Sequence, residues 1–387
     1  MNFALRLKQR FTSLAGSWLG QRNLSGKLLG LILFSGFCVR LYICFFASVP
    51  VMHRDTIEYF DQADAIIVGG YTNFFPNGFP FIVAFFKTVF GENAVTALLW
   101  LSIFFSTLSI YFVFHISRSI FISSSISLIA AFLLAFYPSQ INYVRWLTTE
   151  IPTTFFLTGA YFYYYRRSLW VSGLFFGIAV VIRTEISSIL ILLLAGHLLF
   201  NRKISINLII GASIPIILVG YYCYVKTGEF SLAGHGRVNI IISTTASGGF
   251  IDWGLVDKYP EVNTNSKAVQ MYMNGIKEAP LSYIQRRVAN FWELWGFYPS
   301  SAEGSRSPAT RLTIGMGNFF LLVCGLLGFW RNRKDRNVIL LIIPFVTITL
   351  LHIAFFAMQR YTIPVEPFLL VLSAWAIYEL FLSGKKE

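Results

Sequence analysis

The sequence has few charged residues and very few acidic ones. Only 13% of its 387 residues are charged, and only 18 are Asp or Glu. Soluble globular domains carry about 25% charged residues, whereas hydrophobic residues make up 56% of this chain. The composition therefore excludes a soluble globular domain and predicts an all-α polytopic membrane protein.

Cysteine and histidine are also scarce. The four cysteines all fall in apolar segments, and the five histidines include no pair at the spacing of metal ligands. Neither a disulfide framework nor a zinc site is expected, and no residue is assigned to a metal. A glycine-rich phosphate loop of the Walker A type is missing too, which argues against nucleotide hydrolysis.

Long apolar runs, by contrast, recur along the whole chain. About 20 apolar residues are enough to cross a bilayer, although several runs here are shorter. About ten transmembrane helices are expected, at 28–49, 94–116, 120–137, 151–165, 169–182, 186–200, 204–225, 311–330, 338–357 and 363–382. We expect three parts: an N-terminal transmembrane catalytic module (1–225), an outer loop region (226–310) and C-terminal transmembrane helices (311–387).

The net charge of +13 does not indicate a nucleic-acid partner, because the basic residues sort by loop. Every second predicted span is followed by basic residues, among them Arg166, Arg167, Arg202, Arg331 and Arg336. The positive-inside rule places such loops in the cytoplasm, so both termini are expected there. The first 23 residues predict a basic, amphipathic segment on the membrane surface rather than a cleavable signal peptide.

This topology puts three stretches rich in polar and turn residues on the outer side, roughly 51–92, 138–150 and 226–310. The first should hold a surface helix from about 56 to 68, then an apolar segment at 79–90 that lies in the membrane interface. The third is large enough for a small unit outside the membrane. A helix from about 266 to 295 is expected within it.

Four of the scarce carboxylates follow directly on the first apolar run: Asp55, Glu58, Asp61 and Asp64. A spacing of three turns the face of a helix by about 60° at each step, so Asp55 and Glu58 can face the same way. Such a carboxylate can act as a general base, or it can simply stabilise the start of a helix. Asp55 and Glu58 are therefore candidate catalytic residues, while Asp61 and Asp64 are expected at the surface.

Two further charged residues lie near the outer ends of predicted spans. Glu150 either faces a substrate, or it caps a helix or pairs with Arg145. Arg183 either meets an anionic substrate or pairs with Glu185. Arg40 lies inside the first span, where a charge is costly unless it is paired or faces a cavity. All three predict either a binding site or an internal ion pair.

Arg360 and Tyr361 lie between the last two predicted spans, at the outer side. An arginine there can bind a phosphate through two parallel hydrogen bonds, and the tyrosine can donate one more. Alternatively, the pair binds lipid headgroups within an interfacial aromatic belt.

Several short motifs occur in a fixed order along nearly the whole chain. They are Arg40, Asp55 with Tyr59 and Ala63, Gly69-Gly70-Tyr71, Pro76-Asn77-Gly78-Phe79-Pro80, Phe90-Gly91, Thr149-Glu150, Ile182-Arg183, Gly236-Arg237-Val238-Asn239-Ile240 with Gly248-Gly249, Tyr283 to Trp295, and Arg360-Tyr361-Thr362-Ile363-Pro364. In this order they resemble the GT-C glycosyltransferases. The resemblance is to the bacterial group similar to dolichyl-phosphate-mannose protein mannosyltransferases and to the aminoarabinose transferases of lipid A (glycosyltransferase family 39-like).

This resemblance implies a GT-C fold and an inverting transfer of a hexosyl or pentosyl unit from a polyprenyl-phosphate donor. The acceptor would be a lipid, glycan or protein on the non-cytoplasmic side, and membrane lipids would surround the enzyme. The catalytic base maps onto Asp55, with Glu58 as its competitor. Substrate and donor-phosphate contacts are expected from Arg40, Tyr59, Glu150, Arg183, Arg360 and Tyr361.

The resemblance leaves some questions open. Some GT-C enzymes hold a divalent cation on acidic loop residues, so a cation is one option here. The bacterial inner membrane is the expected location, with the active site facing the periplasm or exterior. Two other functions remain: a transporter or flippase of a lipid-linked saccharide, which would make no new bond, and a polymerase or ligase of surface glycans.

Overall fold

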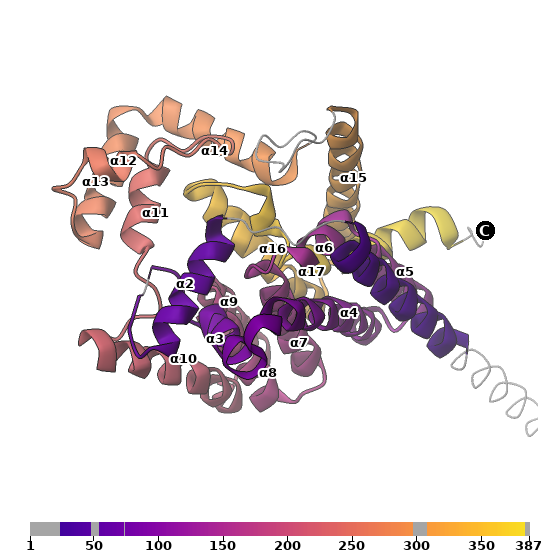
Figure 1. Ribbon diagram of the computed structural model, residues 1–387. Helices are drawn as coiled ribbons and strands as arrows, with labels where there is room; N and C mark the ends of the chain where they lie inside the picture. Colours follow the sequence, from indigo (N-terminus) through magenta and orange to yellow (C-terminus); the bar gives the residue numbers. More distant parts are fainter. Residues whose placement is uncertain (1–23, 48–53, 73, 297–307, 384–387) are drawn as a thin grey trace, which may run out of the picture.

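The structure is a computed structural model that describes residues 24–47, 54–72, 74–296 and 308–383. Within these residues the chain is almost entirely helical and contains no β-strand (Figure 1). The predicted all-α class is confirmed. The basic segment expected in the first 23 residues lies outside the described part of the chain.

Five helical segments in the described chain are long and apolar enough to cross a membrane: Leu24–Ala47, Gly78–Phe121, Ile206–Thr227, Leu312–Asn332 and Arg336–Ala354. A sixth span results if the pair Ser124–Ala135 and Pro138–Arg145, which is bent by 50°, counts as one. The chain is therefore polytopic, with fewer helices of spanning length than the ten spans predicted.

The remaining predicted spans coincide with shorter helices: α7 (Glu150–Tyr165), α8 (Leu169–Ile182), α9 (Ile186–Asn201) and α17 (Glu366–Ile377). All four are shorter than the ~20 residues that cross a bilayer unaided. Most residues of α7 and α17 are buried, so protein rather than lipid surrounds these two helices. Hydropathy places the helices correctly, but it cannot separate a helix buried in protein from one that faces lipid.

The close packing of α8 against α10 (Ile206–Thr227) depends on glycine. Gly173 and Gly177 leave no room for a side chain, since a Cβ on Gly173 would lie 2.2 Å from the carbonyl oxygen of Leu208. Small residues four apart allow helix backbones to approach each other in a membrane. This contact fixes α8, whose last residue directly precedes Arg183.

Two amphipathic helices precede the long helix α4 (Ala94–Phe121). They are α2 (Arg54–Ile67) and α3 (Gly78–Phe90), which pack against each other. Their bounds lie within two residues of the surface helix and the apolar interfacial segment that the sequence predicts. A short 3₁₀ turn joins α3 to α4, and α4 in turn packs against α5 (Ser124–Ala135) and α7.

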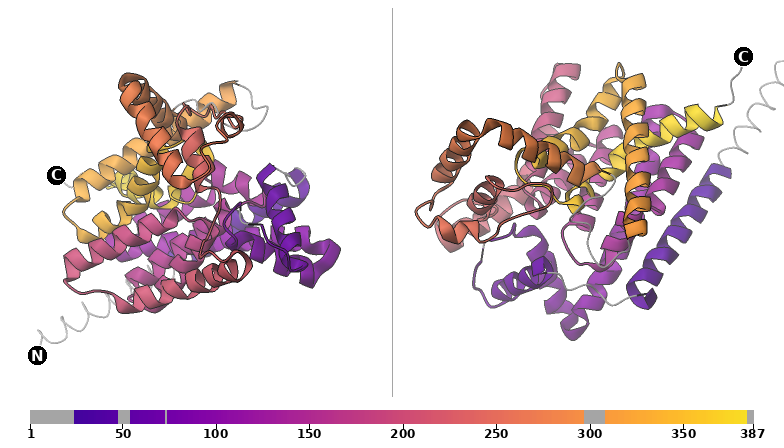
Figure 2. Two further views of the ribbon diagram at one scale, coloured as in Figure 1. Left: turned by 90° about the vertical axis from the view of Figure 1, so that its left-hand side faces the viewer. Right: turned by 90° about the horizontal axis from the view of Figure 1, so that it is seen from above.

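Four helices form a unit between α10 and α15: α11 (Gly236–Ser243), α12 (Leu255–Lys258), α13 (Asn265–Glu278) and α14 (Pro280–Trp295). Figure 2 shows this unit projecting from one side of the bundle. The single helix predicted from 266 to 295 is wrong, because it is broken at Pro280. Proline has no backbone N–H and disfavours the helical conformation of the residue before it, and Ala279 indeed adopts φ −140° and ψ 64°.

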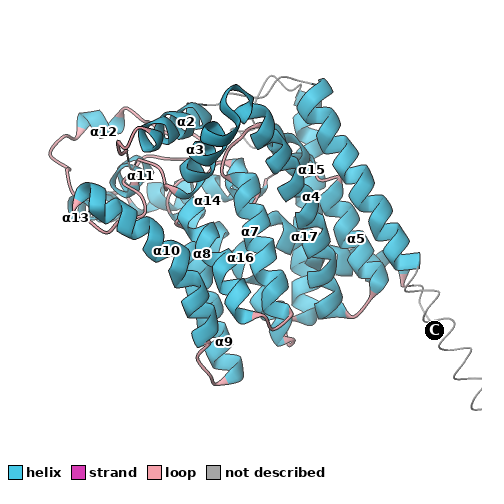
Figure 3. Cartoon of the chain, turned by 60° about the horizontal axis from the view of Figure 1, so that its bottom comes forward, coloured by secondary structure: helices cyan, strands magenta, loops and turns pink. Residues whose placement is uncertain are grey.

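The C-terminal part contains α15 (Pro308–Asn332), α16 (Arg336–Ala354), the short 3₁₀ turn η4 (Gln359–Thr362) and then α17. α15 and α17 pack along each other. Figure 3 shows the bundle with α2, α3 and α11 gathered toward one end.

Candidate functional site

A cavity of about 500 Å³ lies where the surface helices meet the bundle. Its walls come from α2, the start of α7, the turn between α8 and α9, α11, the end of α16, and η4. Six of the predicted site residues line it: Asp55, Tyr59, Glu150, Arg183, Arg360 and Tyr361. The lining as a whole therefore comes from six different parts of the chain, and the six predicted residues come from four of them.

Helix ends bring these residues together. Asp55 lies in the first turn of α2, and Glu150 is the first residue of α7. Arg183 ends α8, because its extended backbone (φ −143°, ψ 106°) stops the helix there. Arg360 lies in η4, which begins at Gln359, shortly after α16 ends at Ala354. Since neighbouring helices of the bundle run in opposite directions, ends that are far apart in sequence meet at the same level.

The charged residues form a chain of alternating sign. Arg360 Nη2 lies 2.7 Å from Asp55 Oδ2, and its Nε lies 3.9 Å from Glu150 Oε1. Arg183 Nη1 lies 3.3 Å from the same Glu150 oxygen, and its Nε lies 2.6 Å from Glu185 Oε1. Three carboxylates and two guanidiniums give this network a formal charge of −1.

The network favours the ionised forms of Arg360 and Glu185. Burial alone would lower the pKa of the Arg360 guanidinium, but Tyr361, Glu150 and Asp55 outweigh burial and hold this pKa above its usual value. Burial alone would raise the pKa of Glu185, but the adjacent Arg183 keeps it below the usual range. Glu185 is thus the partner of Arg183 that the sequence offered as one alternative.

Glu150 is the most buried acid of the network, with a side chain that is 3% exposed. It pairs with the two arginines rather than with Arg145, so the predicted alternative pair is not formed among the described residues. Its second oxygen, Oε2, is buried and has no hydrogen-bond partner in the described structure. A buried acceptor without a donor costs about 1–3 kcal/mol, so a ligand that donates a hydrogen bond here would be stabilised.

Aromatic rings surround the charges. The Tyr361 ring stacks on His352 at 4.3 Å, and the guanidiniums of Arg183 and Arg360 lie 5.3 and 5.5 Å from its centre. Both distances are within the range of a cation–π contact. Burial raises the pKa of the Tyr59 hydroxyl, and the charges of Glu150 and Asp55 raise it further, so this tyrosine stays protonated.

Two histidines of the cavity were missed by sequence reasoning. His352 comes from α16, and His235 directly precedes α11 and forms a 2.6 Å hydrogen bond between its Nδ1 and the carbonyl of Phe74. No pair spacing could have revealed them, because they lie on separate elements. The only available signal was that His235 adjoins the motif beginning at Gly236.

The other three carboxylates of α2 lie outside the cavity. Glu58 does not line the cavity; its Oε1 pairs with Nε of Arg54 at 3.3 Å, where both are solvent-accessible. Asp61 and Asp64 are exposed, as the sequence predicts, and Asp64 pairs with Lys87. Helical drift therefore separates the four carboxylates, and only Asp55 reaches the cavity.

Arg40 is also placed away from the cavity, fully buried in the bundle. Its Nε donates to Ser106 Oγ at 2.7 Å, and its Nη1 donates to the carbonyls of Gly36 and Ala135 at 2.9 Å. Ala135 ends α5, where helix carbonyls lack partners of their own. The structure thus gives Arg40 protein acceptors within the bundle, which satisfy a charge that is costly at membrane depth.

A divalent cation does not fit the described residues. No group of three or more His, Cys, Asp or Glu in the described ranges has the arrangement of a metal site. Asp55, Glu150 and Glu185 each face a guanidinium, whereas hard cations bind where several carboxylate oxygens converge.

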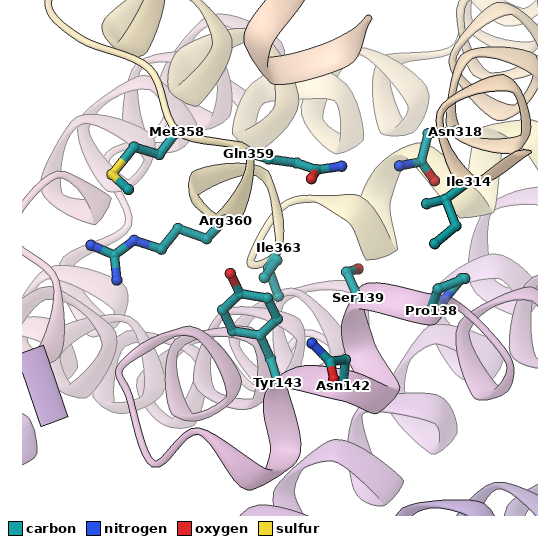
Figure 4. A pocket seen from close by; sticks show the side chains of 10 residues that line it. All are labelled: Pro138, Ser139, Asn142, Tyr143, Ile314, Asn318, Met358, Gln359, Arg360 and Ile363. Atoms are coloured by element: carbon teal, nitrogen blue, oxygen red, sulfur yellow. The ribbon is translucent and has the colours of Figure 1, made fainter. Parts of the chain in front are cut away.

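A second, much smaller cavity of about 40 Å³ adjoins η4 on its other side. It lies between Pro138–Tyr143, the start of α15, and residues 358–363. Figure 4 shows the side chain of Arg360 extending away from Ile314 and Asn318 of α15. Arg360 lines both this cavity and the large one.

The comparisons with known proteins agree with this architecture. Residues 76–222, less than half of the chain, match the family model of dolichyl-phosphate-mannose-protein mannosyltransferases. A search of curated protein sequences finds no significant match.

Two solved structures share the fold. The archaeal oligosaccharyltransferase AglB from Archaeoglobus fulgidus, in complex with an inhibitory peptide and a dolichol-phosphate, is similar with a TM-score of 0.55 and 15% identity, over 93% of this chain and 51% of that one. ArnT from Cupriavidus metallidurans, bound to undecaprenyl phosphate, is similar with a TM-score of 0.52 and 14% identity, over 93% and 60%. This chain spans about half to three fifths of the length of these proteins. It is an integral membrane protein with the fold of the GT-C superfamily, as the sequence predicts.

Proposed function

We propose that the chain is a glycosyltransferase that moves a sugar from a polyprenyl-phosphate donor to an acceptor in the 500 Å³ cavity. The contact between Asp55 and Arg360, beside the buried Glu150, carries this proposal. It joins a potential base to a potential phosphate ligand in one space. Two proteins of the same fold were solved with polyprenyl phosphates, which supports this class of donor.

Arg360 is the proposed ligand of the donor phosphate. Its guanidinium can bind two phosphate oxygens in parallel, and it is held in place by Asp55 and by the ring of Tyr361. When the bond between the sugar and the phosphate breaks, negative charge develops on the departing polyprenyl phosphate. A fixed, buried cation stabilises that charge as it forms, and Arg183 adds a second cation in the same cavity.

Asp55 is the proposed base. Its carboxylate takes the proton of an acceptor hydroxyl or amine while the acceptor atom forms a bond to the anomeric carbon, and the polyprenyl phosphate leaves from the opposite face. A donor phosphate that draws Arg360 toward itself also weakens the contact of Arg360 with Asp55, which makes the carboxylate more available. Glu58 remains the competitor, but its place outside the cavity and its pairing with Arg54 favour Asp55.

The proposal assigns the donor and the acceptor by chemical class. A lipid-linked donor reaches the cavity from the bilayer, and the positive-inside pattern puts this end of the bundle on the non-cytoplasmic side. The acceptor is a lipid, glycan or protein on that side, and a bacterial inner membrane is the proposed location. The free oxygen of Glu150 suits a sugar hydroxyl as donor of a hydrogen bond.

The test uses purified protein in detergent with a panel of polyprenyl-phosphate sugars and acceptors. Formation of a glycosidic bond by the wild type, with at least a 100-fold lower rate for Asp55→Asn, is the expected result. Glu58→Gln is the matched control and should keep its rate within about threefold. Binding of polyprenyl phosphate without any transfer product would favour a flippase, and full activity of Asp55→Asn would rule out the assigned base.

A further inference from the structure

A basic cavity lies at the other end of the bundle. It has a volume of about 170 Å³ and is formed by the end of α4, the end of α7, the end of α9 and the starts of α8 and α16. α9 begins next to Glu185 at the large cavity and ends at Asn201 in this one. At 1.5 Å per residue, its 16 residues separate the two cavities by about 24 Å.

The lining of this cavity is cationic and polar. Arg167 and Arg336 both line it, as do Asn201, His197 and Asn337, and no Asp or Glu belongs to the lining. Neither guanidinium forms an ion pair or side-chain hydrogen bond with a residue of the described chain. Asp335, next to Arg336 in the sequence, accepts from the backbone N–H of Asn337 instead. Two cations without an ion-pair partner in the described chain therefore lie beside one cavity, which predicts an anionic ligand.

Hydrogen bonds at the polar floor of the cavity link the helices around it. His197 is only 8% exposed, and its Nδ1 lies 2.9 Å from the hydroxyl of Tyr164, which joins α9 to α7. The hydroxyl of Tyr165 donates to the carbonyl of Asn337 at 2.8 Å, which joins α7 to α16. The turn after α7 that carries Arg167 and the helix α16 that begins at Arg336 are therefore linked through α7 without help from the arginines themselves.

Other basic residues at this end of the bundle behave differently. Arg118 Nη1 donates to the carbonyl of Ile122, and Arg333 Nη1 donates to the carbonyl of Trp330 and lies over its ring. Neither lines the cavity. If these arginines served only as topology signals, all of them would be expected to behave alike. In the described chain, however, Arg167 and Arg336 lie beside a cavity without partners, whereas Arg118 and Arg333 have partners and lie outside it.

The surroundings indicate the source of the anion. Phe200 lines the cavity, and the neighbouring face of α9 exposes Ile191, Leu192 and Leu199, which are 64%, 47% and 75% accessible. In a membrane protein such a face contacts acyl chains. A lipid with its phosphate in the cavity would lay its chains along this face, and basic pockets between transmembrane helices bind anionic headgroups.

We infer that this basic cavity, between Arg167 and Arg336, is a binding site for a phosphate group supplied by the headgroup of an anionic membrane lipid. Its volume suits this ligand, since a water occupies about 30 Å³ and 170 Å³ exceeds that several-fold. The inference does not depend on sugar transfer at the opposite end of the bundle.

The experiment compares three proteins purified in detergent: wild type, Arg167→Gln/Arg336→Gln, and the control Arg118→Gln/Arg333→Gln. The control removes two positive charges from the same end of the bundle but none from the lining of the cavity. Native mass spectrometry counts bound phosphatidylglycerol against phosphatidylcholine, and thermal unfolding is recorded with each lipid and, in a separate arm, with inorganic phosphate. Gel filtration checks that each variant is folded, and Arg336→Gln alone provides a milder change.

The expected result is at least fivefold less phosphatidylglycerol retained by the cavity variant and no loss in the control. Stabilisation by phosphatidylglycerol, and not by inorganic phosphate, would identify the lipid as the source. Stabilisation by inorganic phosphate alone, abolished in the cavity variant, would keep the phosphate site but replace the lipid by a soluble anion. Equal retention by all three proteins, or equal loss in the cavity variant and the control, would overturn the inference.

Discussion

Arg360 and Asp55 lie 2.7 Å apart, and their contact ties the turn after α16 to the first turn of the surface helix α2. Each residue is mostly buried, with 10% of the Arg360 side chain and 20% of the Asp55 side chain exposed. In the proposed reaction the guanidinium is shared between the carboxylate and the incoming phosphate. The Asp55 carboxylate and the donor phosphate therefore compete for the Arg360 guanidinium.

This competition predicts opposite effects of Asp55→Asn on binding and on rate. The amide keeps the shape but removes the charge that competes for Arg360, so undecaprenyl phosphate should bind at least as tightly as to the wild type, and up to about threefold more tightly. Transfer should nevertheless be almost lost. Titration of the ligand in detergent measures the affinity, and a clearly weaker Kd would contradict the competition.

Arg360→Lys should weaken the binding of undecaprenyl phosphate about tenfold. Lysine keeps the positive charge but cannot form two parallel hydrogen bonds to phosphate, and a tenfold change in Kd corresponds to about 1.4 kcal/mol. Arg54→Lys is the matched control, because Arg54 also pairs with a carboxylate of α2 but is exposed and outside the cavity. Similar Kd values for the two variants would remove Arg360 from the phosphate site.

Glu185→Gln should destabilise the protein more than Glu58→Gln. Glu185 pairs with a buried guanidinium at 2.6 Å, and its loss leaves Arg183 with Glu150 alone, which we expect to cost about 1–3 kcal/mol. Glu58 forms an exposed pair on one helix, where the expected cost is about 0.5 kcal/mol or less. Thermal unfolding in one detergent compares the two, and an equal shift would show that the network does not stabilise the fold.

His235 should make the stability depend on pH. Burial lowers its pKa below the usual 6.5, so the unfolded chain binds a proton at a higher pH than the folded one does. The folded protein, in which His235 stays neutral, therefore loses stability relative to the unfolded chain as the pH falls below about 6.5. Unfolding temperatures between pH 7.5 and 5.5 should fall less steeply for His235→Asn than for the wild type; parallel curves would contradict this.

Much of the fold could be predicted from the sequence, since apolar runs reveal helices wherever they occur. The first turn of α2, the glycine turn before α3 and the end of α8 at Arg183 all lie within a few residues of the predicted positions. The number of spans could not be predicted in this way. α7 is apolar because protein surrounds it, and hydropathy does not distinguish that environment from lipid.

The site was predictable only in part. Asp55, Glu150, Arg183 and Arg360 lie at helix ends, and the resemblance singled them out as a set. The partner of each charge was not predictable, because Arg360 meets Asp55 and Glu150 through packing of α2, α7 and η4. Arg40 shows the same limit: a buried arginine at membrane depth predicts a function by default, yet here its acceptors are protein atoms.

Arg40→Gln should therefore reduce stability without changing donor affinity. The shorter side chain cannot reach Ser106 and the carbonyl of Ala135 together, and each buried group left without a partner costs about 1–3 kcal/mol. We expect a clear fall in the unfolding temperature and a Kd for undecaprenyl phosphate within twofold of the wild type. A stable variant with weakened binding would instead return Arg40 to the substrate site.

Arg287→Gln should destabilise the walls of the large cavity, although Arg287 does not line it. Arg287 on α14 is 7% exposed and donates to the carbonyls of Ala354 and Phe355 at the end of α16, and to that of Ala246 after α11. It thereby holds two walls of the cavity together, one of which continues into η4. Tyr272 and Asn290 still donate to the carbonyls of Ala354 and Phe355, so the loss leaves mainly the buried carbonyl of Ala246 without a donor, which should cost about 1–3 kcal/mol.

The neighbouring Arg286 provides the control for this prediction. It lies on the same helix with the same charge, but its Nη1 donates to Ser282 at the exposed face. Arg286→Gln should leave both the unfolding temperature and the affinity for undecaprenyl phosphate nearly unchanged. Arg287→Gln should lower both, because Arg360 is carried by the turn that α14 fixes; if it lowers the unfolding temperature alone, α14 supports the fold without positioning the phosphate ligand.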